Sequence, residues 1–303
     1  MKKTCLFFFL LLVWASTARA QVTGQFAGAV TDPTGSAVPG AKITVTEVAT
    51  GFTRSVTTGT EGFYTMPSLR PTVYRITVTA AGFRSLTQDG VTLAADQRAT
   101  VNFKLELGAV TESVNITATA VQVDTTSGAI RQVVDSERIL EIPLNGRNAA
   151  TLTLTVAGAY TAPSSGADQG SGKTFPGAVA ISVNGSRQNQ MSYLLDGANH
   201  MDSFSNINAP FPFPDALQEF SVQTSNYSAE SGQNAGGVVN VITKSGTNQF
   251  HGSAFEFVRN AQFNARGFFA AKRDPLKRNQ FGATFGGPVM LPGYKGRDKT
   301  FFF

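Results

Sequence analysis

The chain has 303 residues, of which 42% are hydrophobic and 15% are charged, and this composition excludes disorder as its overall state. The low charge content, with 30 glycines and 24 phenylalanines, favours strands and turns over charged helices. Removing Lys2, Lys3 and Arg19, the basic residues of the first twenty, leaves 22 basic and 20 acidic residues, a balance that excludes nucleic acid as a general partner.

Residues 1–20 have the pattern of a secretory signal peptide. Two lysines precede an apolar stretch at residues 6–14, and Ala18-Arg19-Ala20 forms a small-x-small cleavage site, so we expect a mature chain that begins at Gln21. The apolar stretch is about half of the roughly 20 residues that a membrane-spanning helix needs, which disfavours an N-terminal anchor. Cys5 is the single cysteine. Its loss with the leader excludes disulfides, cysteine–zinc sites and thiol catalysis in the mature chain.

Residues 22–106 are predicted to form a small β-sandwich. Short alternating segments at residues 41–47, 75–80 and 100–105 are separated by turn clusters such as Asp32-Pro33-Thr34-Gly35. Several short strands at this spacing are typical of a two-sheet sandwich.

The same region resembles the carboxypeptidase regulatory-like domain, a transthyretin-like sandwich. The resemblance is carried by residues 28–41 (GAVTDPTGSAVPGA), 60–64 (TEGFY), 74–78 (YRITV) and 81–83 (AGF). It implies that Tyr64 and Phe83 close the ends of the sandwich, while Thr72-Val73 departs from the family, which usually has a glycine before the tyrosine. The family is a folding and binding accessory, so peptidase activity does not follow from its name.

Residues 107–126 are polar and rich in threonine, as expected of an exposed, extended linker. Within it, residues 111–118 (TESVNITA) resemble the TonB box of outer-membrane receptors. An unpaired extended strand can add to the sheet edge of a partner through main-chain bonds, although an ordinary strand would have the same sequence pattern. The resemblance implies contacts with the periplasmic domain of TonB at Glu112, Ser113, Val114, Asn115 and Ile116.

Residues 127–245 resemble the plug domain of a TonB-dependent receptor. Four segments carry the resemblance in order, namely residues 130–148, 179–197, 214–224 and 227–247. The last is the most specific, because a Gly-Gly pair leads into an apolar strand at residues 238–243. The plug candidates that the resemblance singles out are Arg187, Asp196, Gly197, Gly236 and Gly237.

The residues themselves also predict a mixed α/β domain here. Ser136 suits the N-cap of a short helix that Pro143 ends, residues 179–183 alternate as a half-buried strand, and residues 194–197 end a strand at a turn. Several charged positions fit two interpretations, pairing with charges inside a barrel or lying on solvated faces: Arg147, Arg187, Asp196, Glu219 and Lys244.

Residues 246–303 contain eleven of the 24 phenylalanines and nine lysines or arginines against three acids. Phe255 and Phe257 alternate with Glu256 and Val258, which is typical of a transmembrane β-barrel with aromatic side chains toward lipid, although the edge of a globular sandwich would also alternate. Because 58 residues make only three or four spanning strands, against about 22 in plugged transporters, we expect a fragment of a longer protein.

Other motifs point to no chemistry. The run Gly170-Ser171-Gly172-Lys173-Thr174 has the wrong spacing from Gly166 for a phosphate loop, and Pro176 disfavours the helix such a loop requires. His200 suits a solvated loop or a ligand contact at the plug apex, and neither it nor His251 has the spacing of a metal motif. We therefore expect no catalytic residue, no metal site and no cofactor.

Taken together, the chain resembles the Oar-like class of TonB-dependent receptors. The expected fold is mainly β with some α, comprising a transthyretin-like β-sandwich, an α/β plug and the first strands of a transmembrane β-barrel. The resemblance implies a non-enzymatic transporter of the outer membrane, with TonB and membrane lipid as partners and a large saccharide or peptide as substrate. The alternative is a secreted carbohydrate-binding or adhesive sandwich protein without transport activity.

Overall fold

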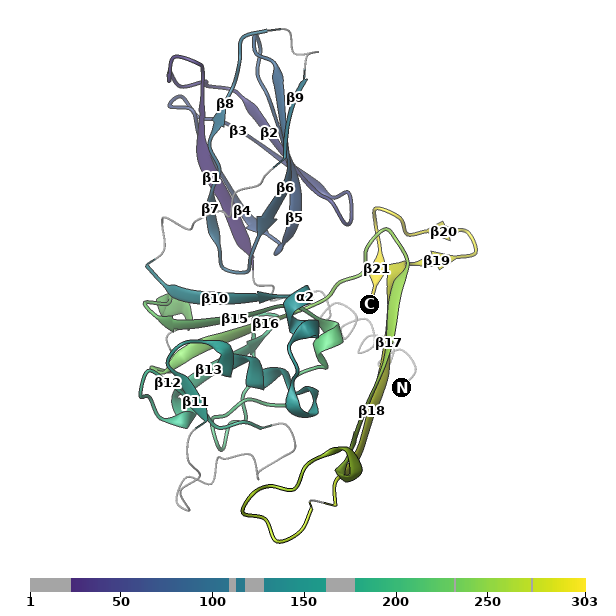
Figure 1. The fold of residues 1–303 in the computed structure, drawn as a ribbon. Helices are drawn as coiled ribbons and strands as arrows, with labels where there is room; N and C mark the ends of the chain where they lie inside the picture. Colours follow the sequence, from purple (N-terminus) through teal and green to yellow (C-terminus); the bar gives the residue numbers. More distant parts are fainter. Residues whose placement is uncertain (1–22, 109–112, 118–127, 162–177, 232, 274) are drawn as a thin grey trace, which may run out of the picture.

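The computed structural model describes residues 23–108, 113–117, 128–161, 178–231, 233–273 and 275–303. The described chain forms a β-sandwich, an α/β unit and a long β-hairpin, in that order (Figure 1). The predicted signal peptide, Gln21, Glu112 and the run Gly170–Thr174 lie outside the described residues. None of the helices that the structure describes is long and apolar enough to cross a bilayer.

The sandwich consists of two sheets. One has the strand order β3-β2-β5-β6-β9, and in the other β1 lies between β4 and β7 and also pairs with β8. The strands are β1 (Gly24–Thr31), β2 (Lys42–Glu47), β3 (Thr53–Thr57), β4 (Phe63–Leu69), β5 (Thr72–Thr79), β6 (Ser85–Leu93), β7 (Arg98–Thr100), β8 (Phe103–Lys104) and β9 (Ser113–Thr117).

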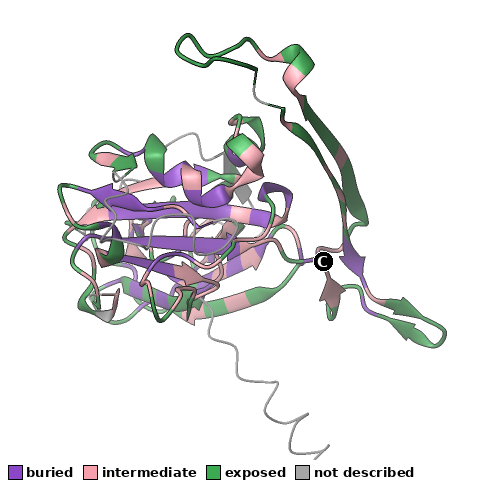
Figure 2. Cartoon of the chain, turned by 90° about the horizontal axis from the view of Figure 1, so that it is seen from below, coloured by how far each residue is buried: buried purple, intermediate pink, exposed green. Residues whose placement is uncertain are grey.

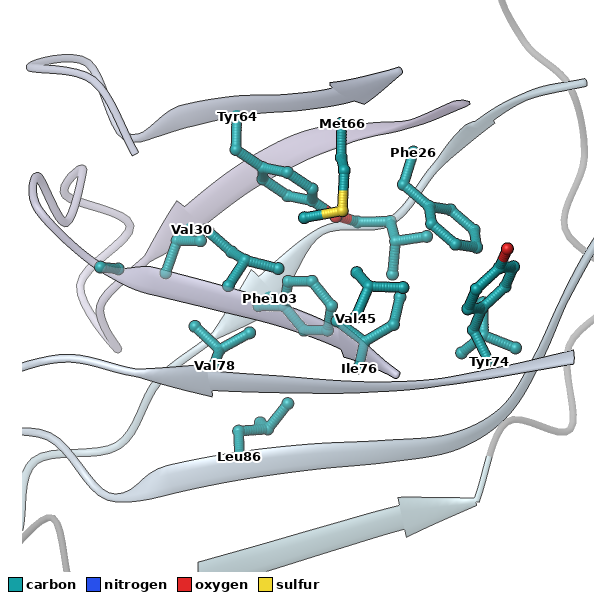
Figure 3. Packing of buried hydrophobic residues seen from close by; sticks show 14 of the residues in the cluster. Phe26, Val30, Val45, Tyr64, Met66, Tyr74, Ile76, Val78, Leu86 and Phe103 are labelled. Carbon is teal, nitrogen blue, oxygen red and sulfur yellow. The ribbon is translucent and has the colours of Figure 1, made fainter. Parts of the chain in front are cut away.

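The hydrophobic core of the sandwich lies between these sheets (Figure 3). Alternate residues of each strand point inward, so Phe26, Ile43 and Ile76 are fully buried while their neighbours face solvent. Tyr64 is buried as predicted, and its hydroxyl donates to the Val101 carbonyl at 2.8 Å. Two of the three predicted strands correspond to β2 and β5.

The third predicted strand, residues 100–105, is divided into β7 and β8. Between them the side chain of Asn102 takes the place of a main-chain partner, because its Oδ1 accepts from the Ala29 N–H at 2.9 Å. A Cβ at Gly28 would lie 2.0 Å from the Val101 carbonyl oxygen, so this close approach of two backbones requires glycine.

Of the two interpretations of residues 111–118, an unpaired strand in an extended linker or an ordinary strand, the structure shows the ordinary strand for Ser113–Thr117. These residues form β9, which pairs in parallel with β6 from Ser85↔Ser113 to Asp89↔Thr117. The chain turns back after β8, since Phe83 bridges to Leu107 and the Arg84 N–H donates to the Glu106 carbonyl at 2.8 Å. The segment therefore extends the sandwich sheet as its last strand.

The second unit is built on a sheet of order β10-β15-β16-β13-β14, in which β13 and β16 run parallel. Its elements are β10 (Ile130–Asp135), α2 (Ser136–Glu141), β11 (Ala159–Thr161), β12 (Ile181–Val183), β13 (Met191–Leu195), β14 (Ala198–Asn199), β15 (Leu217–Ser225), β16 (Gly237–Thr243) and the 3₁₀ helices η1 (Asn145–Arg147), η2 (Ala149–Thr155), η3 (Gln188–Gln190), η4 (Pro214–Ala216) and η5 (Ala229–Ser231).

One face of this sheet is apolar and the other carries polar residues. Phe220 and Val239 pack with Ile139 of α2 and Leu152 of η2 in a second hydrophobic core. The polar residues of the opposite face are also buried, namely Glu219, Ser221, Gln223 and Asn240. Burial of polar side chains indicates that this face packs against another part of the molecule.

Two local expectations for this unit are corrected. Asp135, not Ser136, is the N-cap of α2, because its carboxylate accepts from the Arg138 N–H at 2.9 Å. The segment at residues 179–183 is not half-buried, since all three residues of β12 are buried. The alternation of Ile181 and Val183 predicts one buried face, but it does not predict that Ser182 on the other face is buried as well.

The last part is a hairpin of β17 (His251–Asn260) and β18 (Lys277–Pro288), with η6 (Ala261–Phe263) and the short strands β19 (Met290–Leu291), β20 (Tyr294–Lys295) and β21 (Phe301–Phe302). The hairpin is mostly exposed and projects from the rest of the chain (Figure 2). Phe257 pairs with Gln280 and Glu256 with Phe281, so these pairs lie on opposite faces.

The face that carries Phe255 and Phe257 points toward the α/β unit, which contradicts the expectation that the aromatic face of β17 points to lipid. Phe255 packs edge-on against Phe213 at 6.0 Å between ring centroids. The opposite face of the hairpin presents Phe281 and Phe285, which are 75% and 60% exposed. Alternation predicts two faces but does not say which one meets the neighbouring domain.

Candidate functional site

Four of the five residues predicted to contact TonB lie in one strand. Ser113, Val114, Asn115 and Ile116 belong to β9, at the end of the sheet order β3-β2-β5-β6-β9, and Asn115 is exposed. The sandwich thus holds the TonB-box-like segment in an extended conformation at a sheet edge.

The five predicted plug candidates do not form one site. Arg187, Gly236 and Gly237 lie at the start of the parallel pair β13 and β16, whereas Asp196 and Gly197 lie at its end. Arg187 is exposed, and its backbone N–H donates to the Gln190 side chain at 3.0 Å.

Asp196 holds the end of the parallel pair together. Its φ angle is 51°, and Gly197 follows at 84°, so the turn to β14 uses two left-handed residues. The carboxylate accepts from the Thr243 N–H at 2.9 Å and from the Thr243 hydroxyl at 2.8 Å. These contacts give Asp196 a structural role within the sheet of the α/β unit.

The two glycines permit close packing at the start of β16. A Cβ at Gly236 would lie 2.6 Å from the Ser186 hydroxyl, and one at Gly237 would lie 2.9 Å from the Gln223 carbonyl oxygen. An open hollow beside Gly236 is lined mainly by neutral amide and hydroxyl side chains, among them Asn184, Ser186, Gln190, Ser225 and Tyr227.

Arg147 is the principal contact between the α/β unit and the hairpin. It lies in η1, and its guanidinium carbon is 4.7 Å and 4.2 Å from the ring centroids of Phe255 and Phe257. Beside it, the side chain of Gln280 donates to the Gly146 carbonyl at 2.9 Å, and Arg259 donates to the Asn145 side chain. The turn Asn145–Arg147 therefore engages both strands of the hairpin.

Arg147 also forms a buried ion pair with Asp215 of η4, and the two side chains are only 9% and 10% exposed. Arg147 does not pair with a charge on the hairpin, since it meets aromatic rings there. Burial lowers the pKa of the nearby Lys244, an effect that the negative charge of Asp215 partly opposes. The Arg147–Asp215 pair fixes η1 to η4 within the α/β unit and presents a cation to the hairpin.

Glu219 lies at the contact between the sandwich and the α/β unit. Both of its carboxylate oxygens accept from the Ala95 N–H, at 3.2 Å and 3.1 Å, and Arg131 donates to the Ala95 carbonyl. Asn240 donates to Asp96 at 3.2 Å. The loop between β6 and β7 therefore covers part of the polar face of the plug sheet.

Burial raises the pKa of Glu219 above its ordinary value. The positive charge of Arg131 and the Ala95 N–H act in the opposite direction, and the carboxylate of Asp96 adds to the increase. We expected Glu219 to pair with a charge in a barrel lumen or to be solvated, but the structure assigns it to the sandwich contact.

The sandwich also meets the segments that flank the hairpin. The Asn248 N–H donates to the Ala49 carbonyl at 3.0 Å, and the Asn248 side chain donates to the Thr50 carbonyl at 2.7 Å. The Asp298 N–H donates to Asn248 Oδ1 at 2.8 Å. A single asparagine thus joins the turn after β2 to both ends of the hairpin region.

His200 has structural contacts within the α/β unit. Its ring lies 4.8 Å from that of Phe211, and Nε2 is 3.0 Å from the Pro210 carbonyl. In the part of the chain that the structure describes, no group of three or more histidine, cysteine or acidic side chains is placed to hold a metal ion.

Sequence reasoning missed Asp215, Asn248 and the loop at Ala95 as contact residues. A charged residue directly after Pro214 in an otherwise apolar segment was the one available signal for Asp215. The other two contacts join residues more than 100 positions apart, and no spacing rule predicts such pairs.

Two families match parts of the chain. The carboxypeptidase regulatory-like domain matches residues 25–106, and the outer membrane beta barrel domain matches residues 242–303. A curated relative, the TonB-dependent transporter Oar of Myxococcus xanthus, is 29% identical over 306 residues, which covers 96% of this chain. The chain spans 27% of the length of that relative.

Similar solved structures include two siderophore receptors. A mutant of the ferric enterobactin receptor PfeA from Pseudomonas aeruginosa has a TM-score of 0.41 at 18% identity, covering 54% of this chain and 23% of that chain. The receptor PirA from Acinetobacter baumannii has a TM-score of 0.41 at 21% identity, covering 56% and 24%. Both likenesses are too partial to carry an argument about function.

Proposed function

We propose that the chain is part of an outer-membrane transporter of the TonB-dependent receptor class, which takes up a large substrate with energy supplied through TonB. The observation that carries the proposal is the contact of the Arg147 guanidinium with the rings of Phe255 and Phe257. It places the proposed plug against one face of a hairpin whose other face exposes Phe281 and Phe285, together with Glu256. A barrel wall around a plug has this arrangement.

We propose the corresponding division of the chain. Residues 1–20 are a cleaved signal peptide, 22–106 the regulatory-like sandwich, 107–126 a linker that includes the TonB box, 127–245 the plug, and 246–303 the start of the barrel. Separate hydrophobic cores in the sandwich and in the plug support the boundary between these two domains. The β6–β9 pairing adds the TonB-box segment to the sandwich sheet.

The proposed substrate is a large saccharide or peptide. Its hydroxyl or amide groups would find hydrogen-bond partners in the hollow beside Gly236, which neutral side chains such as Asn184 and Gln190 line. We also propose that the protein is not an enzyme, since the curated relative that matches nearly the whole chain is a transporter.

The test is binding of the purified periplasmic domain of TonB to the protein in detergent, measured by biolayer interferometry. We expect the unsubstituted protein and Val114→Ala to bind, and Val114→Pro to bind at least tenfold more weakly. Proline removes a main-chain donor and fixes φ at about −65°, which a pairing strand cannot accept. Val121→Pro, in the same linker but outside the box, is the matched control.

Equal binding by Val114→Pro and by the unsubstituted protein, or binding by neither, would contradict a TonB-coupled function. Recovery of the protein from the culture medium instead of the outer membrane would support the alternative, a secreted adhesive or carbohydrate-binding sandwich.

A further inference from the structure

The TonB-box segment already lies in a sheet. The five residues of β9 pair in parallel with the first five residues of β6, from Ser85 to Asp89. The pairing ends before Gly90, which has a φ angle of 76°. In the described part of the chain, β9 has no neighbour other than β6, so its outer edge presents main-chain donors and acceptors for another strand.

The edges at β3 and β4 carry features that hinder pairing, and the edge at β9 carries none of them. Strand β3 carries Arg54, whose guanidinium donates to the Pro67 and Ser68 carbonyls at 2.8 Å and 3.0 Å, and β4 contains Pro67 itself. Charged side chains and proline at an edge hinder pairing with a further strand. Strand β9 reads Ser-Val-Asn-Ile-Thr and contains no charge, proline or glycine.

We propose that the periplasmic domain of TonB adds a strand to the outer edge of β9 while β9 remains paired with β6. The regulatory-like sandwich would then be the platform that presents the TonB box, and the complex would contain a continuous sheet β3-β2-β5-β6-β9 extended by a strand of the partner. This inference rests on the proposed function and states how the same segment binds.

The physical advantage of this arrangement is that β9 is ordered before the partner arrives. A free segment loses backbone conformational freedom when it pairs, and that loss opposes binding. In the folded chain the pairing with β6 has already fixed the extended conformation. If β9 had to leave β6 first, the β6–β9 hydrogen bonds would have to break before TonB could bind, and their loss would weaken binding.

A reversible covalent lock separates the two possibilities. Thr87 and Asn115 are register partners in the parallel pair, and Asn115 is exposed. Neighbouring strands place such Cα atoms about 5 Å apart, within the range of a disulfide. We would introduce Thr87→Cys and Asn115→Cys in the complete protein, in which no third thiol interferes because Cys5 is the only natural cysteine and lies in the proposed cleaved leader. Binding of the TonB periplasmic domain would be compared between the oxidised and the reduced form of this same protein.

We expect the disulfide to form, as verified by mass, and the oxidised form to bind within threefold of the reduced form or more tightly. A tenfold or greater loss on oxidation, reversed by reduction, would show that β9 must leave the sheet and would overturn the proposal. Failure of the disulfide to form would contradict the β6–β9 pairing itself. Loss of binding by the reduced form alone would contradict main-chain recognition, whereas no binding by the unsubstituted protein would refute the proposed function instead.

Discussion

Arg147 makes two kinds of contact at once, a buried ion pair and the stacking of a planar cation against aromatic rings. Asp215 supplies the counter-charge inside the plug, and Phe255 and Phe257 of the hairpin supply the rings. Lysine could keep the charge but not the planar fork or the stacking geometry. Position 147 therefore requires arginine to make both contacts.

We predict that Arg147→Ala destabilises the protein by about 3 kcal/mol or more, because it leaves Asp215 buried without a partner. Arg147→Lys should cost about 1 kcal/mol, through the lost stacking. Thermal unfolding in detergent, followed by circular dichroism, measures both. The exposed Arg138→Ala on α2 is the control, and equal unfolding temperatures for Arg147→Ala and Arg138→Ala would refute the role of Arg147.

Glu219 predicts a dependence of stability on pH. Its pKa is raised in the folded state, so the folded protein binds more protons than the unfolded one once the pH exceeds the ordinary value of 4.5. The contribution of Glu219 to stability should be largest below that pH, fall as the pH rises toward the folded pKa, and then level off.

In Glu219→Gln this fall should disappear, while the exposed Glu141→Gln should retain it. Unfolding temperatures measured between pH 4 and pH 8 give the comparison. A pH profile that is the same for Glu219→Gln and for the unsubstituted protein would show that the carboxylate is not the titrating group.

Sequence could predict Glu219 only as a polar position in an alternating strand. Its environment depends on Ala95, which lies 124 positions earlier and belongs to another domain. When a distant loop buries an acidic residue, the local sequence pattern of the strand does not change. Both interpretations of Glu219 from the sequence, a charge facing a barrel lumen and a solvated charge, were therefore wrong.

At the scale of elements, the hairpin has a plug face and an outer face. Ser253 and Ala254 are adjacent in β17 but lie on opposite faces, since Ser253 shares the side of Phe255 and Ala254 pairs with Ala283. This adjacency provides a matched pair of substitutions for testing which face meets lipid.

We predict that Ala254→Arg prevents stable insertion into the outer membrane and that Ser253→Arg is tolerated better. An arginine on the lipid face of a barrel costs up to about 2–4 kcal/mol near the bilayer midplane. The measurement is the fraction of full-length receptor that migrates as a folded barrel in unheated gels of outer-membrane fractions. The reverse order of the two variants would mean that the faces are assigned wrongly.

Elements with a buried apolar pattern were the predictable ones. Strand β16 follows its Gly-Gly pair and is buried as expected, and the fold class is confirmed. Strand β9 was predicted as extended, with its pairing left open, because a short polar strand has the same sequence whether it is paired or not. Its place beside β6 joins residues 28 positions apart, such as Ser85 and Ser113, and the sequence has no strong signal for that pairing.

For the molecule as a whole, export is the first requirement. We predict that mass spectrometry of protein from envelope fractions finds Gln21 as the N-terminal residue. Ala20→Lys should leave the leader attached, because signal peptidase requires a small residue there, whereas Arg19→Ala at the neighbouring position should still be cleaved. An intact segment 1–20 on envelope protein would refute this prediction.

The two contacts of the sandwich determine how a mechanical load would pass through the chain. A pull on β9 travels along the backbone to β10, and it also travels through β6 to Ala95, whose carbonyl is held by Arg131 of the same β10. The backbone route ends on β10, whereas the route through the loop at Ala95 is shared with β15 and β16, through Glu219 and Asn240. Since β10 is the edge strand of the plug sheet and pairs only with β15 among the described strands, it is the strand that tension would peel away first. The buried polar face behind it, including Glu219, would then open to water before the apolar core of the plug is disturbed.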